Sequence, residues 1–571
     1  MKLKRNTPRS FKVTNTQSKY SLSLRKLLGY NLIAALACGL AAPSWAQEAS
    51  DWTEQFACPA GKSTVDTSQQ VIAAGFNVDQ DQTRSLSAEL AGVSKAELAN
   101  LEIAWAIGFP GQGNGTGAAV LGNTLYVNGG ERLLALEAES GCVQWSIEAN
   151  SRNTPSIGEL NGRTVVAVSV GRSGDILVVD AKNGEKIWQA NGLASDNGGA
   201  VRGGVTIYDN KVIVPISASG VGAGMRSSFE CCVGHGAVVA LSGKDGSKLW
   251  EYHTMPTATY NGRVSSQGVK QRGPSGAPIW SFPMVDAKRN RVLVTTGENT
   301  SHPGTNTSDA IIAIDLDTGK EAWVFQAMEF DIWNMACRSS QEDSGPNCPW
   351  NIKGDKGTGR DFDFGAGAII VNDVNSRDLV LGGQKSGDAW ALDANTGELV
   401  WNIRFGEGTA LGGVHWGITT DGERLYVPIS DPFVGTSQTP KPGVYAVDLK
   451  TGKEVWAYEV KANCEGPRGE LVNSCESKYG FSVAPLTVDG AVIAGTLGGE
   501  VFILDGENGK LINRIDTIGP VETINDVEAS GGSIDSHGIS AGAGLILINS
   551  GYRSFGQTAG NALIAYRPAS K

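Results

Sequence analysis

One stretch of the chain gathers residues whose side chains could do chemistry. Residues 276–323 contain an aromatic side chain, Trp280, and three oxygen donors, Glu298, Asn299 and Asp309, in segments between apolar runs. Carboxylate and amide oxygens are the ligands that calcium prefers, and a positioned aspartate can accept a proton as a general base. We predict that Glu298 and Asn299 bind calcium and that Asp309 is the catalytic base. Solvated loop residues and a turn aspartate are the alternative interpretations.

Two adjacent cysteines, Cys231 and Cys232, form a second chemical signal, and Glu230 precedes them with a further carboxylate. Free thiols, or two separate bridges to other cysteines, are one possibility. The other is a disulfide between the neighbours, whose strained ring is rarely kept without a functional reason. We predict this vicinal disulfide, and we predict that Glu230 joins Glu298 and Asn299 as a metal ligand.

The elements that must position these residues form an internal repeat. Each copy is an apolar strand, a turn carrying Asp/Asn-Gly or Thr-Gly, and a second strand that closes on Trp. The glycine relieves a positive φ in the turn, and the tryptophan can fill the space between neighbouring sheets. The seven copies are LLALEAESGCVQW, ILVVDAKNGEKIW, VVALSGKDGSKLW, IIAIDLDTGKEAW, AWALDANTGELVW, VYAVDLKTGKEVW and the degenerate VFILDGENGKLIN.

An eighth unit is divided between the two ends of the repeat region. LEIAWAIG at 101–108 has the texture of an outer strand, and ALIAY at 562–566 has the texture of its inner partner. Pairing these segments would close the ring and remove its exposed sheet edges. We therefore predict an all-β fold, an eight-bladed β-propeller over residues 96–571, closed by its N- and C-terminal strands.

The N-terminal region has the pattern of an export signal. Residues 1–46 contain eight Lys/Arg and no Asp or Glu, include an apolar segment at 27–42, and end in Ser-Trp-Ala. We predict a signal peptide cleaved after Ala46, and hence a periplasmic or secreted protein. Residues 47–95 are predicted to form an N-terminal extension with a short helix near 94–99. No other segment is long and apolar enough to span a membrane.

Charge narrows the classes of partner. The whole chain carries 48 basic and 59 acidic residues, a net charge of −11, and without the eight basic residues of 1–46 the balance is 40 − 59 = −19. Such a surface argues against nucleic acid and against anionic membranes, while a basic protein partner remains possible.

Eight cysteines follow residue 46, an even number that favours disulfides in an exported chain. Cys337 with Cys348, and Cys464 with Cys475, are near enough in sequence to staple loops, and Cys58 with Cys142 would be the leftover pair, but the spacing does not fix the connectivity. No C-x-x-C-H motif occurs, so we expect no covalently bound haem, and no Cys/His cluster has zinc-ligand spacing.

The repeat resembles the tryptophan-docking repeat of quinoprotein alcohol dehydrogenases, which use pyrroloquinoline quinone. The resemblance narrows to the polyvinyl alcohol dehydrogenases through longer segments. These are FECCVGHGAVVAL, GAPIWSFPMVD, DIWNMAC, NCPW, DFDFGAGAII, GGQKSGDAWALD, GGVHWG, GGSID and NSGYRSFGQTAGNALIAY. The resemblance implies oxidation of an alcohol, secondary or polymeric, with pyrroloquinoline quinone and Ca²⁺.

The same resemblance implies roles for individual side chains. The Cys231–Cys232 ring would form a platform on one face of the quinone, and Trp280 in GAPIW would stack on the other. Lys385 in GGQKSG would donate to the quinone oxygens, and Arg202 in VRGGV and Trp416 in HWG would line the pocket.

The chain also departs from the polyvinyl alcohol dehydrogenase pattern. Those relatives usually carry a cytochrome domain, of which only Cys58 in FACPAGK is a trace here, and Glu298 stands where related enzymes often have a calcium-binding Asn. We therefore expect an external electron acceptor such as a cytochrome c. The alternative hypothesis is a non-catalytic propeller, a scaffold or envelope assembly protein, although such a protein has no reason to retain Cys-Cys, GAPIW and GQKSG together.

Overall fold

The computed structural model describes residues 52–570, except residues 80, 112, 114, 172–173, 195–197, 354–358 and 432–439. The predicted signal peptide, residues 1–46, lies outside this part of the chain. In the part that the structure describes, no helix is long and apolar enough to cross a membrane.

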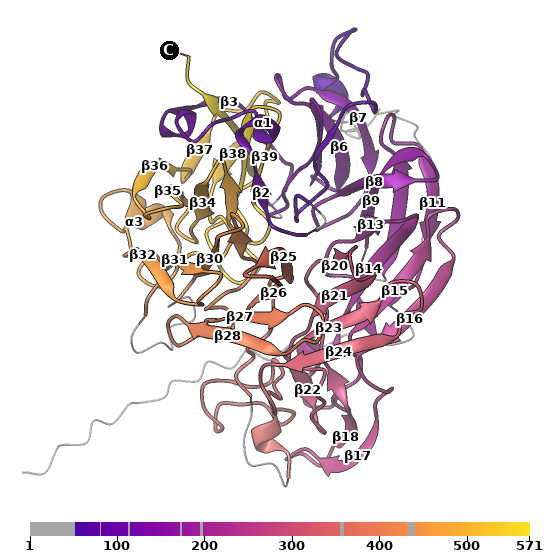
Figure 1. Cartoon of the computed structure of the whole chain (residues 1–571). Coiled ribbons are helices and arrows are strands. Elements are labelled where there is room, and N and C mark those ends of the chain that lie inside the picture. Colours follow the sequence, from indigo (N-terminus) through magenta and orange to yellow (C-terminus); the bar gives the residue numbers. More distant parts are fainter. Residues whose placement is uncertain are drawn as a thin grey trace, which may run out of the picture. The chain divides into compact units, whose positions relative to one another are not determined.

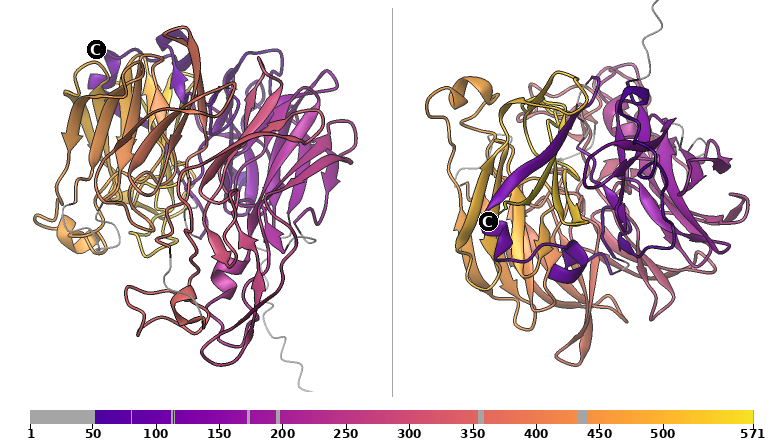
Figure 2. Two further views of the ribbon diagram at one scale, coloured as in Figure 1. Left: turned by 60° about the horizontal axis from the view of Figure 1, so that its bottom comes forward. Right: turned by 90° about the horizontal axis from the view of Figure 1, so that it is seen from above.

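The described chain folds into eight antiparallel sheets, the blades of a β-propeller, arranged around a ring (Figures 1 and 2). This confirms the predicted eight-bladed fold. Blade 1 contains β4 (Ala119–Leu121), β5 (Thr124–Gly129), β6 (Arg132–Glu137) and β7 (Val143–Glu148), and blade 2 contains β8 (Ser156–Leu160), β9 (Arg163–Val170), β10 (Asp175–Asp180) and β11 (Lys186–Ala190). Blade 3 contains β13 (Thr206–Tyr208), β14 (Lys211–Ala218), β15 (Ala237–Ser242) and β16 (Lys248–His253), and blade 4 contains β20 (Met284–Asp286), β21 (Arg291–Thr295), β23 (Ala310–Asp315) and β24 (Glu321–Gln326).

The second half of the ring continues the order. Blade 5 contains β25 (Ile369–Val374), β26 (Arg377–Gly383), β27 (Asp388–Asp393) and β28 (Leu399–Arg404), and blade 6 contains β29 (Thr419–Thr420), β30 (Arg424–Ile429), β31 (Gly443–Asp448) and β32 (Glu454–Glu459). Blade 7 contains β33 (Leu486–Val488), β34 (Ala491–Gly495), β35 (Glu500–Asp505) and β36 (Leu511–Asp516), and blade 8 contains β39 (Ile539–Gly542), β40 (Leu545–Ser550), β41 (Ala562–Pro568) and β3 (Leu101–Gly108). Short strands in the connections are β12 (Gly199–Ala200), β17 (Thr259–Val264), β18 (Lys270–Gly273), β19 (Ser275–Gly276), β22 (Asn299–Ser301), β37 (Gly519–Val521) and β38 (Ala529–Gly531).

Blade 8 joins the two ends of the ring, as the sequence predicts. β3 pairs antiparallel with β41, in a register that runs from Leu101 opposite Pro568 to Gly108 opposite Ala562. The outer strand of this blade therefore comes from the N-terminal side and its three inner strands come from the C-terminal side. Because β3 completes blade 8, every blade of the ring packs against a neighbour on both sides, and neither end of the propeller is left exposed.

The repeat's tryptophan and glycine act across neighbouring blades. Trp401 ends blade 5 and donates its indole N–H to Leu449 O of blade 6 at 2.9 Å. A Cβ added to Gly452 in the next turn would lie 2.6 Å from the Trp401 ring, and its φ is +67°. The glycine is thus required both by its backbone conformation and by the ring above it. The other tryptophan–glycine pairs are Trp105–Gly141, Trp145–Gly184, Trp188–Gly246, Trp250–Gly319, Trp323–Gly397 and Trp456–Gly509.

The degenerate repeat ends where no further turn is available. Asn513 replaces the tryptophan at the end of blade 7, and its side chain donates to Leu98 O at 3.0 Å. Blade 8 takes its outer strand from the N-terminal side, so it lacks the continuous turn on which a docking tryptophan would pack. Trp105 on that outer strand continues the docking pattern toward blade 1.

Residues 52–95 pack onto the propeller. β1 (Val71–Ala73) extends blade 1 and β2 (Ser85–Leu86) extends blade 7. The helical turns here are η1 (Glu54–Phe56) and α1 (Ala88–Ala91), and η2 (Glu97–Ala99) follows just after residue 95, within the range 94–99 predicted for a short helix. The Cys58–Cys142 disulfide ties this segment to blade 1.

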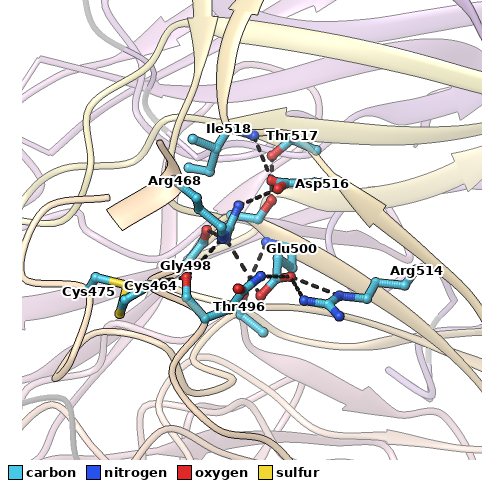
Figure 3. A network of polar contacts seen from close by, with 12 residues as sticks. Cys464, Arg468, Cys475, Thr496, Gly498, Glu500, Arg514, Asp516, Thr517 and Ile518 are labelled. Atoms are coloured by element: carbon cyan, nitrogen blue, oxygen red, sulfur yellow. Dashed lines mark hydrogen bonds and ion pairs between the residues drawn. A yellow bond between two sulfur atoms is a disulfide. The ribbon is translucent and has the colours of Figure 1, made fainter. Parts of the chain in front are cut away.

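The remaining disulfides hold loops on the propeller. Cys337–Cys348 encloses the loop before η3 (Pro349–Asn351), and Cys464–Cys475 encloses α3 (Arg468–Leu471). Figure 3 shows Arg468 from this second loop between Glu500 and Asp516 of blade 7, where it forms ion pairs with both carboxylates. The pairings predicted from the cysteine spacing are therefore present.

Candidate functional site

The ten residues predicted to form the catalytic, cofactor or metal site lie on one face of the ring, and the reason is topological. The strands of each blade run alternately up and down, so the connection from the second to the third strand and the connection to the next blade leave from the same face. The other connections are short turns on the opposite face. The long connections carry Arg202, Glu230, Cys231, Cys232, Trp280, Glu298, Asn299, Asp309, Lys385 and Trp416.

A buried lysine lies at the centre of these connections. Lys385, between β26 and β27, is 4% exposed, and its Nζ lies 2.9 Å from Asp361 Oδ1 and 3.0 Å from Asp363 Oδ2. Burial alone would lower the pKa of Lys385, but these two carboxylates raise it above its usual value. The ammonium is therefore held in its charged form, with one of its three N–H donors left for a further partner.

Three carboxylates surround that ammonium. One oxygen each from Glu298, Asp361 and Asp363 lies within 4.8 Å of the others, an arrangement that could hold a metal ion. Burial raises the pKa values of Glu298 and Asp361, and the charge of Asp363 raises that of Glu298 further. Burial also acts on Asp363, but Lys385 lowers its pKa to about 2. One lysine thus neutralises only part of a concentrated negative charge.

Asp309 belongs to the same electrostatic group. The residue is fully buried, and among the described residues neither of its carboxylate oxygens has a hydrogen-bond partner. Its backbone has a φ of +48°, and its N–H donates to Gly297 O at 2.9 Å. Burial raises the pKa of Asp309 well above its usual value, and the charges of Asp331 and Asp363 add to that effect. An unpartnered buried carboxyl in a strained conformation is costly, which points to a role beyond packing.

Two predicted aromatic residues border this group. The Trp280 indole N–H donates to Asp363 Oδ2 at 3.1 Å, and Lys385 Nζ lies 5.3 Å from the Trp280 ring centroid. Trp416 meets Trp280 edge-on, with 5.1 Å between the ring centroids, and the His415 ring lies 5.9 Å from Trp280 and 4.9 Å from Trp416. The structure therefore brings Trp280, Lys385, Glu298 and Asp309 together.

The vicinal disulfide is present. Cys231 and Cys232 are bonded to each other and are fully buried. Asn334 lies against them, with its side-chain nitrogen 3.7 Å from Cys231 Sγ and 3.9 Å from Cys232 Sγ, and the same amide donates to Thr300 O. Because Thr300 follows Glu298 by two residues in β22, one loop links the disulfide to the acidic group.

Two predicted metal ligands, Glu230 and Asn299, and the predicted pocket residue Arg202 lie on the same face but outside the group around Lys385. Glu230 pairs with Arg272 at 2.8 Å and is 44% exposed, so its carboxylate is outside the buried group. The Asn299 amide is already engaged, because its oxygen accepts from Thr305 N in the same connection at 2.9 Å and its nitrogen donates to Ser275 O of β19 at 3.3 Å. Arg202 is exposed, and its charge acts on Tyr552. The contacts described for Glu230, Asn299 and Arg202 therefore do not connect these side chains to Glu298, Asp361 or Asp363.

Comparison with known proteins decides the family. The chain is 31% identical over 476 residues to a polyvinylalcohol dehydrogenase from a Pseudomonas species, covering 81% of this chain and 70% of that protein. It is 30% identical over 529 residues to a polyvinylalcohol dehydrogenase from Sphingopyxis sp. strain 113P3, covering 89% and 78%. Residues 77–340 match the family model described as "Glucose/ethanol/alcohol dehydrogenase, beta-propeller domain". The chain belongs to the pyrroloquinoline quinone-dependent alcohol dehydrogenase family.

As a member of this family the protein is an oxidoreductase. Its fold agrees with solved quinoprotein structures. The quinohemoprotein alcohol dehydrogenase of Comamonas testosteroni superposes with a TM-score of 0.59 at 16% identity, covering 91% of this chain and 84% of that one. A europium-containing methanol dehydrogenase gives 0.58 at 14% identity, covering 86% and 98%. Residues 308–533 also match a model described as "Outer membrane protein assembly factor BamB". The repeat alone therefore does not distinguish a quinoprotein dehydrogenase from an assembly factor. The two polyvinylalcohol dehydrogenases, which match over most of the chain, make that distinction.

Sequence reasoning did not single out the two aspartates that contact Lys385. Asp361 and Asp363 lie in DFDFGAGAII, a segment recognised for its resemblance to the quinoprotein family but not for its acids. The D-x-D spacing was the available signal, because alternate residues of an extended segment point to the same side. Asp331 was also missed. Its carboxylate accepts from Phe362 N at 2.8 Å and so fixes the segment that carries both aspartates.

Proposed function

We propose that this protein is an exported quinoprotein dehydrogenase that oxidises a secondary or polymeric alcohol with pyrroloquinoline quinone and Ca²⁺. The observation that carries the proposal is the group formed by Glu298, Asp309, Asp361 and Asp363 around a single buried lysine, Lys385. The family assignment supports the quinone, and the names of the two polyvinylalcohol dehydrogenases support the substrate class.

The donor set fits a divalent cation. Four carboxylates and one ammonium give a formal charge of −4 + 1 = −3 when all five groups are ionised, which burial strongly disfavours. Glu298, Asp361 and Asp363 offer the hard oxygen ligands that calcium prefers. We propose that these three residues would hold the metal, in place of the predicted set Glu230, Glu298 and Asn299. Glu230 is engaged with Arg272, and the Asn299 oxygen is engaged with Thr305.

Each side chain then has a distinct task. When bound, the quinone supplies a two-electron acceptor and calcium supplies a Lewis acid. Asp309 accepts the hydroxyl proton of the alcohol at a carboxylate oxygen, since neither oxygen is otherwise engaged. Lys385 directs its remaining N–H toward cofactor oxygens and stabilises negative charge there. Trp280 supplies an aromatic face, held in place by its bond to Asp363. The Cys231–Cys232 ring would provide a second flat face for the quinone, and Trp416, which packs against Trp280, and Arg202 would line the pocket.

Electrons then leave for an external acceptor. The chain's net charge of −11 favours a basic protein such as a cytochrome c, which opposite charge would steer toward this surface. An exported location is consistent with disulfides between distant residues, such as Cys58 and Cys142.

Reconstitution of the purified protein tests this proposal. Apoprotein loaded with pyrroloquinoline quinone and Ca²⁺ is expected to reduce an artificial electron acceptor only when an alcohol is present. A panel of primary alcohols, secondary alcohols and polyvinyl alcohol would identify the substrate class, with secondary or polymeric alcohols giving the highest kcat/KM. Protein that binds the quinone but oxidises none of these alcohols would contradict the proposal.

A further inference from the structure

Beside the candidate site, three buried side chains from three blades form a hydrogen-bonded chain. His415 precedes β29 and its Nδ1 lies 2.9 Å from Ser482 Oγ, in the connection before β33. Ser482 Oγ donates to Asp535 Oδ1, before β39, at 2.6 Å. His415 is 2% exposed, and Ser482 and Asp535 are fully buried. Polar groups this deep in a propeller are costly unless they are satisfied, and these satisfy one another.

The partners of Asp535 define the direction of each proton. Asp535 Oδ1 also accepts from Ser536 N at 2.8 Å, and Oδ2 accepts from Gln557 Nε2 at 2.9 Å. Asp535 accepts in each of these bonds, so the hydroxyl proton of Ser482 must point toward Asp535. Ser482 Oγ must then accept from His415, which places the imidazole proton on Nδ1 and leaves Nε2 as an acceptor.

One end of this chain adjoins the candidate site. The His415 ring lies 5.9 Å from the Trp280 ring, and burial together with the positive charge of Lys385 lowers the pKa of His415 well below its usual value. The other end approaches exposed residues. Burial and the charge of Asp535 raise the pKa of Tyr552, a buried residue, while the exposed side chains Arg152 and Arg202 lower it.

We propose that His415, Ser482 and Asp535 form a proton relay that carries protons out of the dehydrogenase site. The inference rests on the proposed function. Oxidation of an alcohol to a carbonyl compound releases two electrons and two protons. A one-electron acceptor, taken up twice, removes only the electrons, so two protons must leave the site in each turnover. In one transfer, His415 Nε2 accepts a proton, Nδ1 passes its proton to Ser482 Oγ, and the Ser482 proton passes to Asp535.

The chemistry of the acceptor end suits that task. Burial raises the pKa of Asp535 to about 6, although its hydrogen bonds oppose the shift, so this carboxylate can take up and release a proton near neutral pH. After one transfer the imidazole carries its single proton on Nε2 and Asp535 carries the transferred proton. Rotation of the ring returns the imidazole N–H to the side of Ser482, and loss of the Asp535 proton completes the return to the starting state. Asp309 remains the base that contacts the substrate, and the relay is a separate exit.

Ser482→Ala removes the central hydroxyl, and Ser482→Thr retains it. Ser550→Ala is the matched control, because Ser550 is also fully buried and hydrogen-bonded, to Gly532 O at 2.9 Å, but lies outside the chain of three residues. In stopped flow with a ferricenium salt as one-electron acceptor and a pH indicator, Ser482→Ala should slow proton release about 10-fold or more relative to wild type. Reduction of the bound quinone by alcohol should be unchanged. Ser482→Thr should restore the rate, and Ser550→Ala should match wild type.

A second readout needs no cofactor. The chain has five histidines, so ¹⁵N-histidine labelling of the apoprotein gives few signals, and the His415 signal is assigned by its loss in His415→Gln. We expect a neutral His415 with its proton on Nδ1, and loss of that tautomer preference in Ser482→Ala. A wild-type His415 with its proton on Nε2, or proton release in Ser482→Ala at the wild-type rate, would overturn the relay. If the protein oxidises no alcohol, the proposed function fails, and the tautomer still decides the geometry of the relay.

Discussion

Asp309→Asn is expected to lower kcat by roughly 10²- to 10⁴-fold, the usual loss for one general base. The substitution keeps the size of the side chain and removes the proton acceptor. Quinone binding should change little, because it is assigned to Trp280, Lys385 and the Cys231–Cys232 ring. Stability should not fall, since burial already disfavours the charged form of Asp309. Steady-state kinetics, quinone titration and thermal unfolding measure the three quantities.

The matched control is Asp286→Asn. Asp286 is also buried, but it pairs with Arg289 at 2.9 Å in a turn on the opposite face of the ring. This variant should lose stability and keep kcat, the reverse of the result for Asp309. If Asp309→Asn retains full activity with every alcohol, the base is another residue, and Glu298 is the next candidate.

Lys385→Met should have the largest effect on folding. It leaves Glu298, Asp361 and Asp363 buried without a counter-charge, and breaking a buried ion pair in this way typically costs about 3–5 kcal/mol. Denaturant unfolding of the apoprotein measures the loss. Added Ca²⁺ should stabilise Lys385→Met more than wild type, because the ion replaces the missing positive charge.

The sign of the pH effect follows from the carboxyl pKa values. In the folded protein the pKa values of Glu298 and Asp361 are already raised, and loss of the ammonium raises them further. Acids with a raised folded pKa bind more protons in the native state than in the unfolded state, so their contribution to stability falls as pH rises. The deficit of Lys385→Met should therefore be smallest near pH 4–5, close to the unfolded carboxyl pKa, and grow toward neutral pH.

Lys288→Met serves as the control for Lys385→Met. Lys288 contacts Asp378 at 2.6 Å, but its side chain is 63% exposed, and surface ion pairs contribute about 0–1 kcal/mol. Equal losses of stability in the two variants would show that burial of the lysine is not what matters.

The propeller could be predicted from the sequence because its determinants are local. Each copy of the repeat contains its own strand, turn glycine and closing tryptophan, and the unmatched strands 101–108 and 562–566 indicate how the ring closes. The double role of a glycine such as Gly452 needed coordinates, since only they show the ring of Trp401 packed above it.

The site was harder to predict from the sequence than the fold, because its residues come from the connections of different blades. Trp280, Glu298 and Lys385 could be proposed from motifs, and they do meet. Glu230 carries the same chemical signal in the sequence as Glu298, yet one pairs with Arg272 at the surface while the other is buried. Spacing along the chain does not report which way a loop side chain turns. His415 lies in the segment GGVHWG, from which only Trp416 was predicted to line the site. The proposed role of His415 depends on its hydrogen bond to Ser482, which in turn contacts Asp535, and the sequence does not show these contacts.

The calcium affinity of Glu298→Gln against Glu230→Gln tests the central claim most directly, because one predicted ligand lies inside the buried group and the other outside it. Titration calorimetry would be performed with pyrroloquinoline quinone present. The account predicts that wild type and Glu230→Gln bind Ca²⁺ equally, and that Glu298→Gln binds it roughly 10-fold or more weakly. Calcium binding that is lost in Glu230→Gln and intact in Glu298→Gln would contradict the placement of the metal beside Lys385.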